Sequence, residues 1–331
     1  MAGCEWTSKA ERNLSGYLDQ VQRVSQQPAN TLAAIDTSVQ RYPGRRSIQL
    51  PVTDLRINFW EALSLLKCDV QDLIAERNSI LSKVMPVSRL LHWEHRFLIK
   101  ITACRAELPD DQEKDDKLPA RLDSIITIKE KDLSSVYWNA TFASPEFQKL
   151  FSLAVSPLDP AADYPVHRKV VAALEYFSVV GRHLGRPDFD MDISEMENNN
   201  QALQIEPYGA ALLKSIQLLR EYLNAVALSI DAALAQNPNP GPETLNSYFE
   251  IFRTTYGPTI QPYLSAVHRN GQEFLSALNQ LYESQPASTP ENFRDYYQRY
   301  LSMETPDGLW QQFERAIQRH NRSWQKLLDL R

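Results

Sequence analysis

The sequence predicts an all-α protein, a multi-helix bundle of about nine to eleven helices arranged in one domain or in two helical lobes. Three observations lead to this class. Only 10 of the 331 residues are glycine, whereas β-sandwiches and glycine-rich nucleotide-binding folds need glycine at turns with positive φ. Apolar residues recur at three- and four-residue spacing, and the 20 prolines stand mostly between these periodic stretches.

Four helix starts carry the same local pattern, in which a small residue precedes proline and then an acid. The small residue caps free amides, proline has no amide to satisfy, and the acid suits the positive end of the helix. The four triplets are Ser144-Pro145-Glu146, Gly241-Pro242-Glu243, Thr289-Pro290-Glu291 and Thr305-Pro306-Asp307.

The first third of the chain predicts four helices. Residues 5–27 and 29–41 are amphipathic, and the Tyr42-Pro43-Gly44 corner ends the second helix. Residues 54–84 carry one apolar stripe, which predicts a single helix of about eight turns. Pro86 then opens a helix that reaches about residue 106.

A charged stretch at 109–119, flanked by prolines, predicts an exposed loop and a boundary. It divides an N-terminal helical region, 1–108, from a C-terminal helical region, 120–331, although one continuous domain is the alternative. Residues 121–137 would suit a short strand or a helix, and the helical context favours helix.

The middle of the chain predicts helices over 145–155, 165–185 and 207–236, with an acidic loop over 186–206. Gly185 ends the second of these helices, and Glu206-Pro207 opens the third.

The last third predicts an aromatic helix from Pro242 that is interrupted at Gly257-Pro258, followed by a helix to about residue 284. Two further helices are expected over 290–302 and 306–330.

Charge and cysteine content limit the function classes. The net charge of −6 disfavours nucleic-acid binding. Cys4, Cys68 and Cys104 are odd in number and far apart, which indicates neither a disulfide framework nor a metal-binding spacing and favours a reducing compartment. Ala2 excludes myristoylation, and no run of about 18 apolar residues occurs. The sequence therefore predicts a soluble cytoplasmic protein without membrane insertion.

Three polar clusters suggest metal binding, each with a simpler alternative. Clustered carboxylates at 110–116 could hold magnesium against a diphosphate, but a charged stretch between prolines is typical of an exposed loop. Asp188, Asp190 and Asp192 are spaced like the start of a calcium loop, but the expected glycine and glutamate are missing. His92 and His95 could share a metal on one helix face, or belong to a basic surface that meets an acidic partner.

Aromatic and arginine residues are dense in the final third, where helical spacing favours core packing over a ligand site. Within this region, Tyr-Phe-Glu-Ile-Phe-Arg-Thr-Thr-Tyr-Gly at 248–257 resembles a helix of the indoleamine and tryptophan dioxygenase-like helical haem proteins. The segment 293–301, which ends in Arg299-Tyr300-Leu301, resembles a later helix of that family. The resemblance covers the C-terminal quarter of the chain.

The resemblance implies a ligand pocket in which Arg253 holds the carboxylate of an aromatic amino acid-like substrate, with Tyr256, Arg299 and Tyr300 beside it. It also implies haem as the cofactor, with His320 or His268 as the ligand of the iron. The sequence departs from the family at Arg322-Ser323-Trp324-Gln325, where glutamine stands in the position of the family's iron-binding histidine.

Two functions follow. The first is a protein-interaction scaffold or regulator that binds a protein partner on a helix face. The alternative is an enzyme or ligand-binding protein with an aromatic and arginine pocket in the C-terminal half, including a haem-dependent oxygenase. The pocket alternative predicts that Arg253, His268 or His320 lines an enclosed cavity, and the scaffold predicts an exposed apolar patch.

Overall fold

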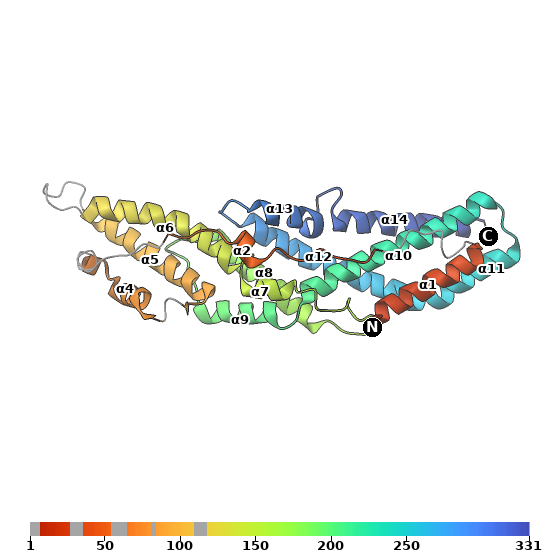
Figure 1. Cartoon of the computed structure of the whole chain (residues 1–331), viewed down its shortest axis with the longest axis horizontal. Helices are drawn as coiled ribbons and strands as arrows, with labels where there is room; N and C mark the ends of the chain where they lie inside the picture. Colours follow the sequence, from red (N-terminus) through yellow and green to blue (C-terminus); the bar gives the residue numbers. More distant parts are fainter. Residues whose placement is uncertain (1–6, 27–35, 54–64, 81–83, 109–117, 331) are drawn as a thin grey trace, which may run out of the picture.

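A computed structural model describes residues 7–26, 36–53, 65–80, 84–108 and 118–330. Within these ranges every regular element is a helix and no strand occurs. The all-α multi-helix prediction is confirmed. The helices form an elongated molecule in which α10 runs along the right-hand half of Figure 1 and the α5–α6 pair forms the left-hand end.

The first helix, α1 (Lys9–Ser25), begins where Ser8 Oγ accepts a hydrogen bond from the backbone N–H of Glu11 at 3.1 Å. Its buried face packs against the 29-residue helix α10 (Tyr208–Gln236), and α14 (Leu309–Leu328) packs along another side of α10. The first and last helices of the chain, α1 and α14, thus both pack against α10.

The helix predicted for 54–84 is wrong in its described part. Leu65–Cys68 form the short 3-10 helix η2, and α4 (Gln71–Asn78) follows after Asp69, which has φ 50°. This left-handed residue ends the first turn, and Lys100 Nζ holds it in place through its backbone oxygen at 2.7 Å. Residues 54–64 and 81–83 lie outside the described ranges.

The second predicted helix, 29–41, is also wrong where it is described. Residues 36–44 are not helical, and the short α2 (Arg45–Ile48) begins after the Tyr42-Pro43-Gly44 corner. The predicted corner is present, but the preceding residues form no regular element, and Tyr42 is buried against the rings of Phe151 and Phe293.

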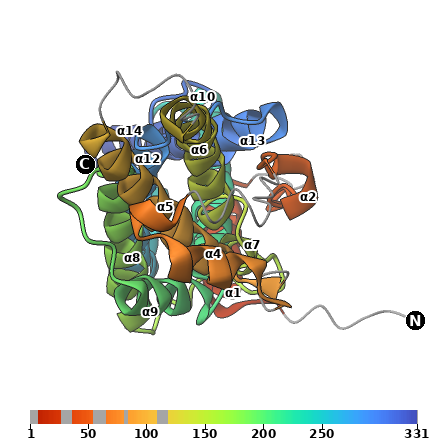
Figure 2. The ribbon, with the colours of Figure 1, turned by 90° about the vertical axis from the view of Figure 1, so that its left-hand side faces the viewer.

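Residues 121–137 are helical, as the context favoured. They belong to α6 (Leu118–Ala140), which packs against α5 (Val87–Glu107) at the end of the molecule nearest the viewer in Figure 2. The two helices lie on either side of the predicted boundary at 109–119, whose residues 109–117 are outside the described ranges. Buried apolar residues from before and after this point form one cluster, which favours the continuous-domain alternative.

The next helices are α7 (Pro145–Leu150) and α8 (Pro165–Arg182). The acidic loop predicted over 186–206 is wrong, because α9 (Ile193–Gln204) occupies most of it. The side chain of Asp192 accepts from the amides of Ser194 and Glu195 at 2.7 and 3.4 Å, which is the N-cap arrangement.

The interruption predicted at Gly257-Pro258 is wrong too. A π-helix, η4 (Phe252–Ile260), joins α11 (Pro242–Ile251) to α12 (Gln261–Glu283) without a break. The wider π-turn accommodates Pro258, which has no amide to donate. A second π-helix, η5 (Tyr297–Leu301), continues α13 (Glu291–Tyr296).

The predicted helix starts at Pro145 and Pro242 are confirmed, and Ser144 Oγ accepts from the Phe147 amide at 3.2 Å. The other two helices begin later, at Glu291 and Leu309. At the last start, Gly308 is the extended N-cap residue, so the helix begins after the triplet.

The cysteine interpretation needs correction. Cys68 and Cys104 form a disulfide with a Cα–Cα distance of 5.1 Å, joining η2 to α5. The two cysteines are 36 residues apart in the sequence and meet because η2 packs against α5.

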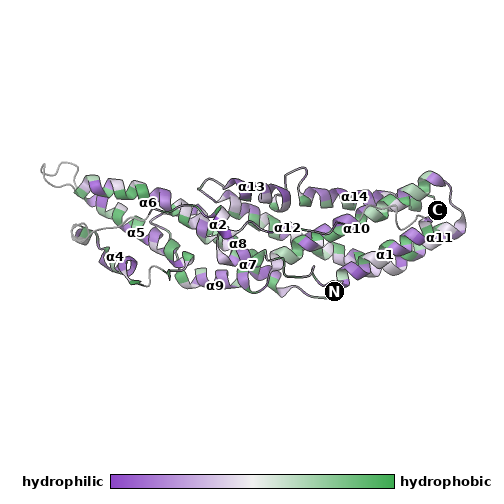
Figure 3. Ribbon diagram, in the orientation of Figure 1, coloured by the Kyte–Doolittle hydropathy of each residue, from purple (hydrophilic) through white to green (hydrophobic). Residues whose placement is uncertain are grey.

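Figure 3 shows hydrophobic and hydrophilic residues interleaved along the helices. Among the described helices, none is long and apolar enough to cross a membrane.

Candidate functional site

The residues that the haem-protein resemblance singled out do not come together around one cavity. Arg253 is exposed and pairs with Glu250, its Nη2 lying 2.9 Å from Oε1. Tyr256 is buried on η4, where its ring centroid lies 5.0 Å from that of His320. The arginine therefore points to solvent while the tyrosine belongs to the core.

His320 is 1% exposed and lies in a packed aromatic cluster. Trp324 Nε1 donates to Tyr17 Oη at 2.8 Å, and Tyr17 Oη lies 2.9 Å from His320 Nε2. Trp324 Nε1 also donates to His320 Nε2 at 3.2 Å, and because an indole can only donate, Nε2 is the acceptor of a neutral ring and the Tyr17 hydroxyl donates to it as well. Burial lowers the pKa of His320 to about 4.

His268 lies elsewhere, on α12. Its Nε2 is 2.8 Å from Glu314 Oε1, and its ring lies against Trp310 with centroids 5.3 Å apart. The side chain is about one-third exposed. This arrangement is an ordinary interhelical hydrogen bond between α12 and α14.

Arg299 and Tyr300 lie on η5, near the segment that follows residue 36. The Arg299 guanidinium carbon is 5.5 Å from the centroid of the Tyr300 ring, and the Tyr300 hydroxyl accepts from the Gln40 amide at 3.1 Å. Tyr300 thus anchors an extended segment of the chain.

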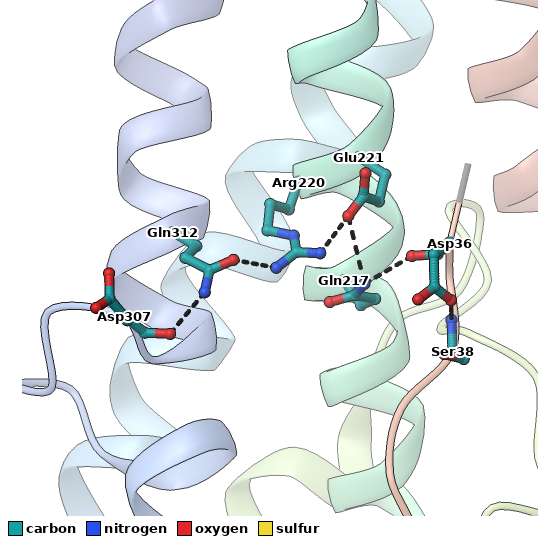
Figure 4. Close-up of polar contacts among 7 residues, drawn as sticks. All are labelled: Asp36, Ser38, Gln217, Arg220, Glu221, Asp307 and Gln312. Carbon is teal, nitrogen blue, oxygen red and sulfur yellow. Dashed lines mark hydrogen bonds and ion pairs between the residues drawn. The ribbon is translucent and has the colours of Figure 1, made fainter. Parts of the chain in front are cut away.

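A chain of polar contacts runs from α14 across α10 to the segment at residue 36, as Figure 4 shows. Arg220 is its centre and donates to both Gln312 and Glu221. On the other side, Gln217 Nε2 donates to the Asp36 carbonyl at 2.7 Å. Because the Arg220 guanidinium is bonded on both sides, this chain joins elements and offers no free cation to a ligand.

The sequence clusters proposed for metal binding have structural partners. Asp192 caps α9 and Asp188 pairs with Arg186 at 2.8 Å. His95 uses both ring nitrogens, because Nδ1 accepts from Gly185 N at 3.1 Å and Nε2 lies 3.1 Å from the Phe189 carbonyl. The carboxylates at 110–116 lie outside the described ranges. No group of three or more His, Cys, Asp or Glu side chains suited to a metal occurs in the part of the chain that the structure describes.

A different part of the structure forms a cavity of the size that ligands occupy. It has a volume of about 420 Å³ and lies where α8 and α10 begin. We call it the α8–α10 pocket. Its lining comes from residues 155–159, 162–165, 206–208 and 211.

The pocket walls are the proline-rich corner before α8 and the first turn of α10. Pro165 stands at the first turn of α8, and Pro207 is the N-cap residue of α10. The corner is fastened to α10 because the Leu158 amide donates to Ser215 Oγ at 2.9 Å. Lys214 Nζ also donates to the carbonyls of Leu153 and Val155, each at 2.7 Å.

Tyr208 lines the pocket and is held from behind by two further helices. Its hydroxyl lies 2.8 Å from His167 Nδ1 on α8, and His167 Nε2 lies 2.7 Å from Glu273 Oε2 on α12. A carboxylate only accepts, so on the neutral imidazole Nε2 carries the proton, Nδ1 accepts, and the Tyr208 hydroxyl donates. This relay keeps the tyrosine in one orientation.

The charged groups that line the pocket are carboxylates. Asp159, Asp163 and Glu206 are all exposed at its rim, and no Lys, Arg or His belongs to its lining. Burial raises the pKa of Tyr164 to about 12, with a further contribution from Asp159. Burial also raises the pKa of Tyr208. Both hydroxyls therefore remain protonated at neutral pH.

A family model described as "Protein of unknown function (DUF3080)" matches residues 14–330. The chain belongs to this family. The match runs from within α1 to the end of α14, so this DUF3080 chain carries the whole α8–α10 pocket inside the family region. No curated protein and no solved structure matches the chain.

The sequence reasoning missed this pocket in the DUF3080 chain. Residues 156–164 fall between the predicted helices 145–155 and 165–185, and Glu206-Pro207 was expected only to open a helix. The signal was the recurrence at both places of a tyrosine next to a proline with an acid one or two residues away. Only the packing of α8 beside α10 places the two segments on one cavity.

Proposed function

We propose that this protein is a small-molecule-binding protein whose ligand occupies the α8–α10 pocket. The observation that carries the proposal is the 420 Å³ cavity, which falls in the size range of ligand sites and combines apolar surface with a few polar groups. This proposal keeps the ligand-binding alternative from the sequence but moves the site away from Arg253.

The frame around the cavity supports binding because it is held in place before a ligand arrives. Ser215 and Lys214 fasten the corner, and His167 orients Tyr208. A pocket with fixed walls loses little conformational entropy on binding, which favours affinity.

A pair of alanine-to-tryptophan variants tests the proposal. Ala162 is exposed and lines the pocket, whereas Ala235 is exposed near the far end of α10. We expect ligand-observed NMR with a mixed fragment collection to find binders of the native protein and of Ala235→Trp that Ala162→Trp no longer binds. If the binders are retained by a folded Ala162→Trp, or no fragment binds the native protein, the proposal is wrong.

A haem site is not supported by the arrangement of the residues. His320 Nε2 already accepts from Tyr17, and His268 Nε2 is bonded to Glu314. Neither histidine lines the α8–α10 pocket or the cavities formed around Leu50, Trp93 and Tyr248. We therefore derive no chemistry through haem or through an aromatic amino acid.

The scaffold function stays a prediction. Large exposed apolar side chains occur singly on several elements, for example Val179 on α8, Ile205 after α9 and Leu228 on α10. Capture of a protein partner by the native chain, followed by loss of that partner in a Leu228→Lys variant, would support it.

The cytoplasmic location also stays a prediction. The disulfide between Cys68 and Cys104 weighs against it, because structural disulfides persist mainly in oxidising compartments. Non-reducing mass analysis of protein taken from the native cell, with and without alkylation, decides between a reducing and an oxidising compartment. Free thiols at Cys68 and Cys104 would support the cytoplasm, and an intact disulfide would contradict it.

A further inference from the structure

We propose that the α8–α10 pocket selects an organic cation, a ligand with an ammonium group and a small apolar body. This inference rests on the proposed function and names the class of ligand for the same site.

The rim attracts positive charge. Asp159, Asp163 and Glu206 line the pocket, and each places an exposed carboxylate at its rim. Their charge is poorly compensated nearby. Lys9 Nζ is 3.9 Å from Asp159 Oδ1, with both side chains about half exposed, and such a pair contributes little.

Lys214 lies close to the pocket wall, but its ammonium group is bonded to backbone carbonyls. Lys214 Nζ is bonded to the Leu153 and Val155 carbonyls and does not line the cavity. A cationic ligand would therefore meet carboxylates at the rim, and an anion would be repelled by them.

The hydroxyl groups of the two tyrosines that line the pocket already have partners within the protein. The Tyr164 hydroxyl donates to the Asp159 carbonyl, and the Tyr208 hydroxyl donates to His167 Nδ1. With both protons in use, neither tyrosine can donate to an anion in the pocket. Aromatic rings flanked by carboxylates are the surroundings in which proteins bind ammonium groups.

The starts of α8 and α10 act in the opposite direction, because a free helix N-terminus carries about half a positive unit charge and favours anions. Here proline removes part of that effect. Pro165 has no amide, the His167 amide donates to the Tyr164 carbonyl at 3.0 Å, and the Tyr208 amide donates to the Glu206 carbonyl at 2.8 Å. Three full carboxylate charges therefore outweigh the two partial charges.

The remaining surface suits the apolar part of such a ligand. Pro157, Leu158 and Pro207 line the cavity with Ala211. A quaternary ammonium compound with a short tail combines the required charge and apolar surface within this volume.

The test uses choline and its neutral isostere 3,3-dimethylbutan-1-ol, which have the same shape and differ in charge. Isothermal titration of the full chain should show choline binding about tenfold or more tightly than the alcohol, and the difference should shrink as salt is raised. Asp163→Asn and Glu206→Gln should each weaken choline binding by about threefold to tenfold without a matching effect on the alcohol. Glu130→Gln, at an exposed site on α6, is the matched control and should leave both affinities unchanged.

The outcomes separate this inference from the proposed function. If the alcohol binds as tightly as choline and Ala162→Trp blocks both, the pocket binds ligands but the cation preference is wrong. If choline does not bind up to about 10 mM while a neutral or anionic fragment does bind in a manner blocked by Ala162→Trp, the cation preference is also wrong. If choline, the alcohol and every fragment fail to bind, both the function and the ligand class are overturned.

Discussion

The buried His320 predicts a specific loss of stability in mild acid. Its pKa falls from an ordinary value of 6.5 to about 4 because burial opposes the charged ring. The unfolded chain therefore binds a proton near pH 6.5, whereas the folded chain does so only near pH 4. Stability is complete above pH 6.5 and is lost as the pH falls toward 4.

The magnitude follows from the two pKa values. The difference between 6.5 and about 4 corresponds to about 3 kcal/mol of unfolding free energy once both values have been passed. No carboxylate is among the described polar partners of the ring, which are the Tyr17 hydroxyl, the Trp324 indole and the Asn321 side chain, whose hydrogen bond offsets only part of the effect of burial on the pKa. Asp231, on α10, is bonded to Ser323 and Lys326 instead.

The assay is urea unfolding of the native protein and of His320→Gln at intervals between pH 8 and pH 4, values chosen to bracket the two pKa values. Glutamine is neutral throughout and keeps an acceptor for Tyr17. Burial also lowers the pKa of His92 and of His95, so both proteins should lose some stability in acid. The native protein should lose about 3 kcal/mol more than the variant. Parallel curves for the two proteins would refute the reasoning.

Three further predictions concern a buried ion pair, the disulfide and a close packing contact. Lys129 Nζ lies 2.8 Å from Glu94 Oε1 in a buried pair, so Lys129→Met leaves Glu94 without its partner and should lower the free energy of unfolding in urea by about 3–5 kcal/mol. The double variant Lys129→Met with Glu94→Leu should recover most of that loss. If it recovers none, an unpaired buried charge is not the cause. Cys68→Ser removes the disulfide and should lower the free energy of unfolding by about 2–4 kcal/mol relative to the oxidised native protein. After reduction, the native protein and the variant should have the same melting temperature. Gly271→Ala places a methyl 2.7 Å from the Trp310 ring and should cost about 1–3 kcal/mol, whereas an unchanged melting temperature would show that the ring moves aside freely.

The sequence predicted local features well where their cause is local. The helix starts at Pro145 and Pro242 depend on a cap, a proline and an acid within three residues, and the structure has them at those places. The last two starts, predicted at residues 290 and 306, lie one and three residues later, at Glu291 and Leu309, after the N-cap residues Pro290 and Gly308.

The predictions failed where a distant contact decides the local structure. The helix predicted over 54–84 is broken at Asp69, which Lys100 holds from α5. The interruption predicted at Gly257-Pro258 is absent because a π-helix carries the chain through it. The spacing of apolar residues cannot predict either effect. It indicates which face of a helix is buried, and it does not indicate which distant residue forms a hydrogen bond with the backbone.

By itself, the sequence determined that the chain is helical, since glycine scarcity, apolar spacing and proline placement each act within a few residues. The tertiary structure alone decided which helices meet, and with them every site of interest. It paired Cys68 with Cys104, enclosed His320 between Tyr17 and Trp324, and set the acids and tyrosines of two separate segments around one cavity. The physical reason is that these arrangements depend on burial and distance between residues far apart in the chain, which no local pattern records.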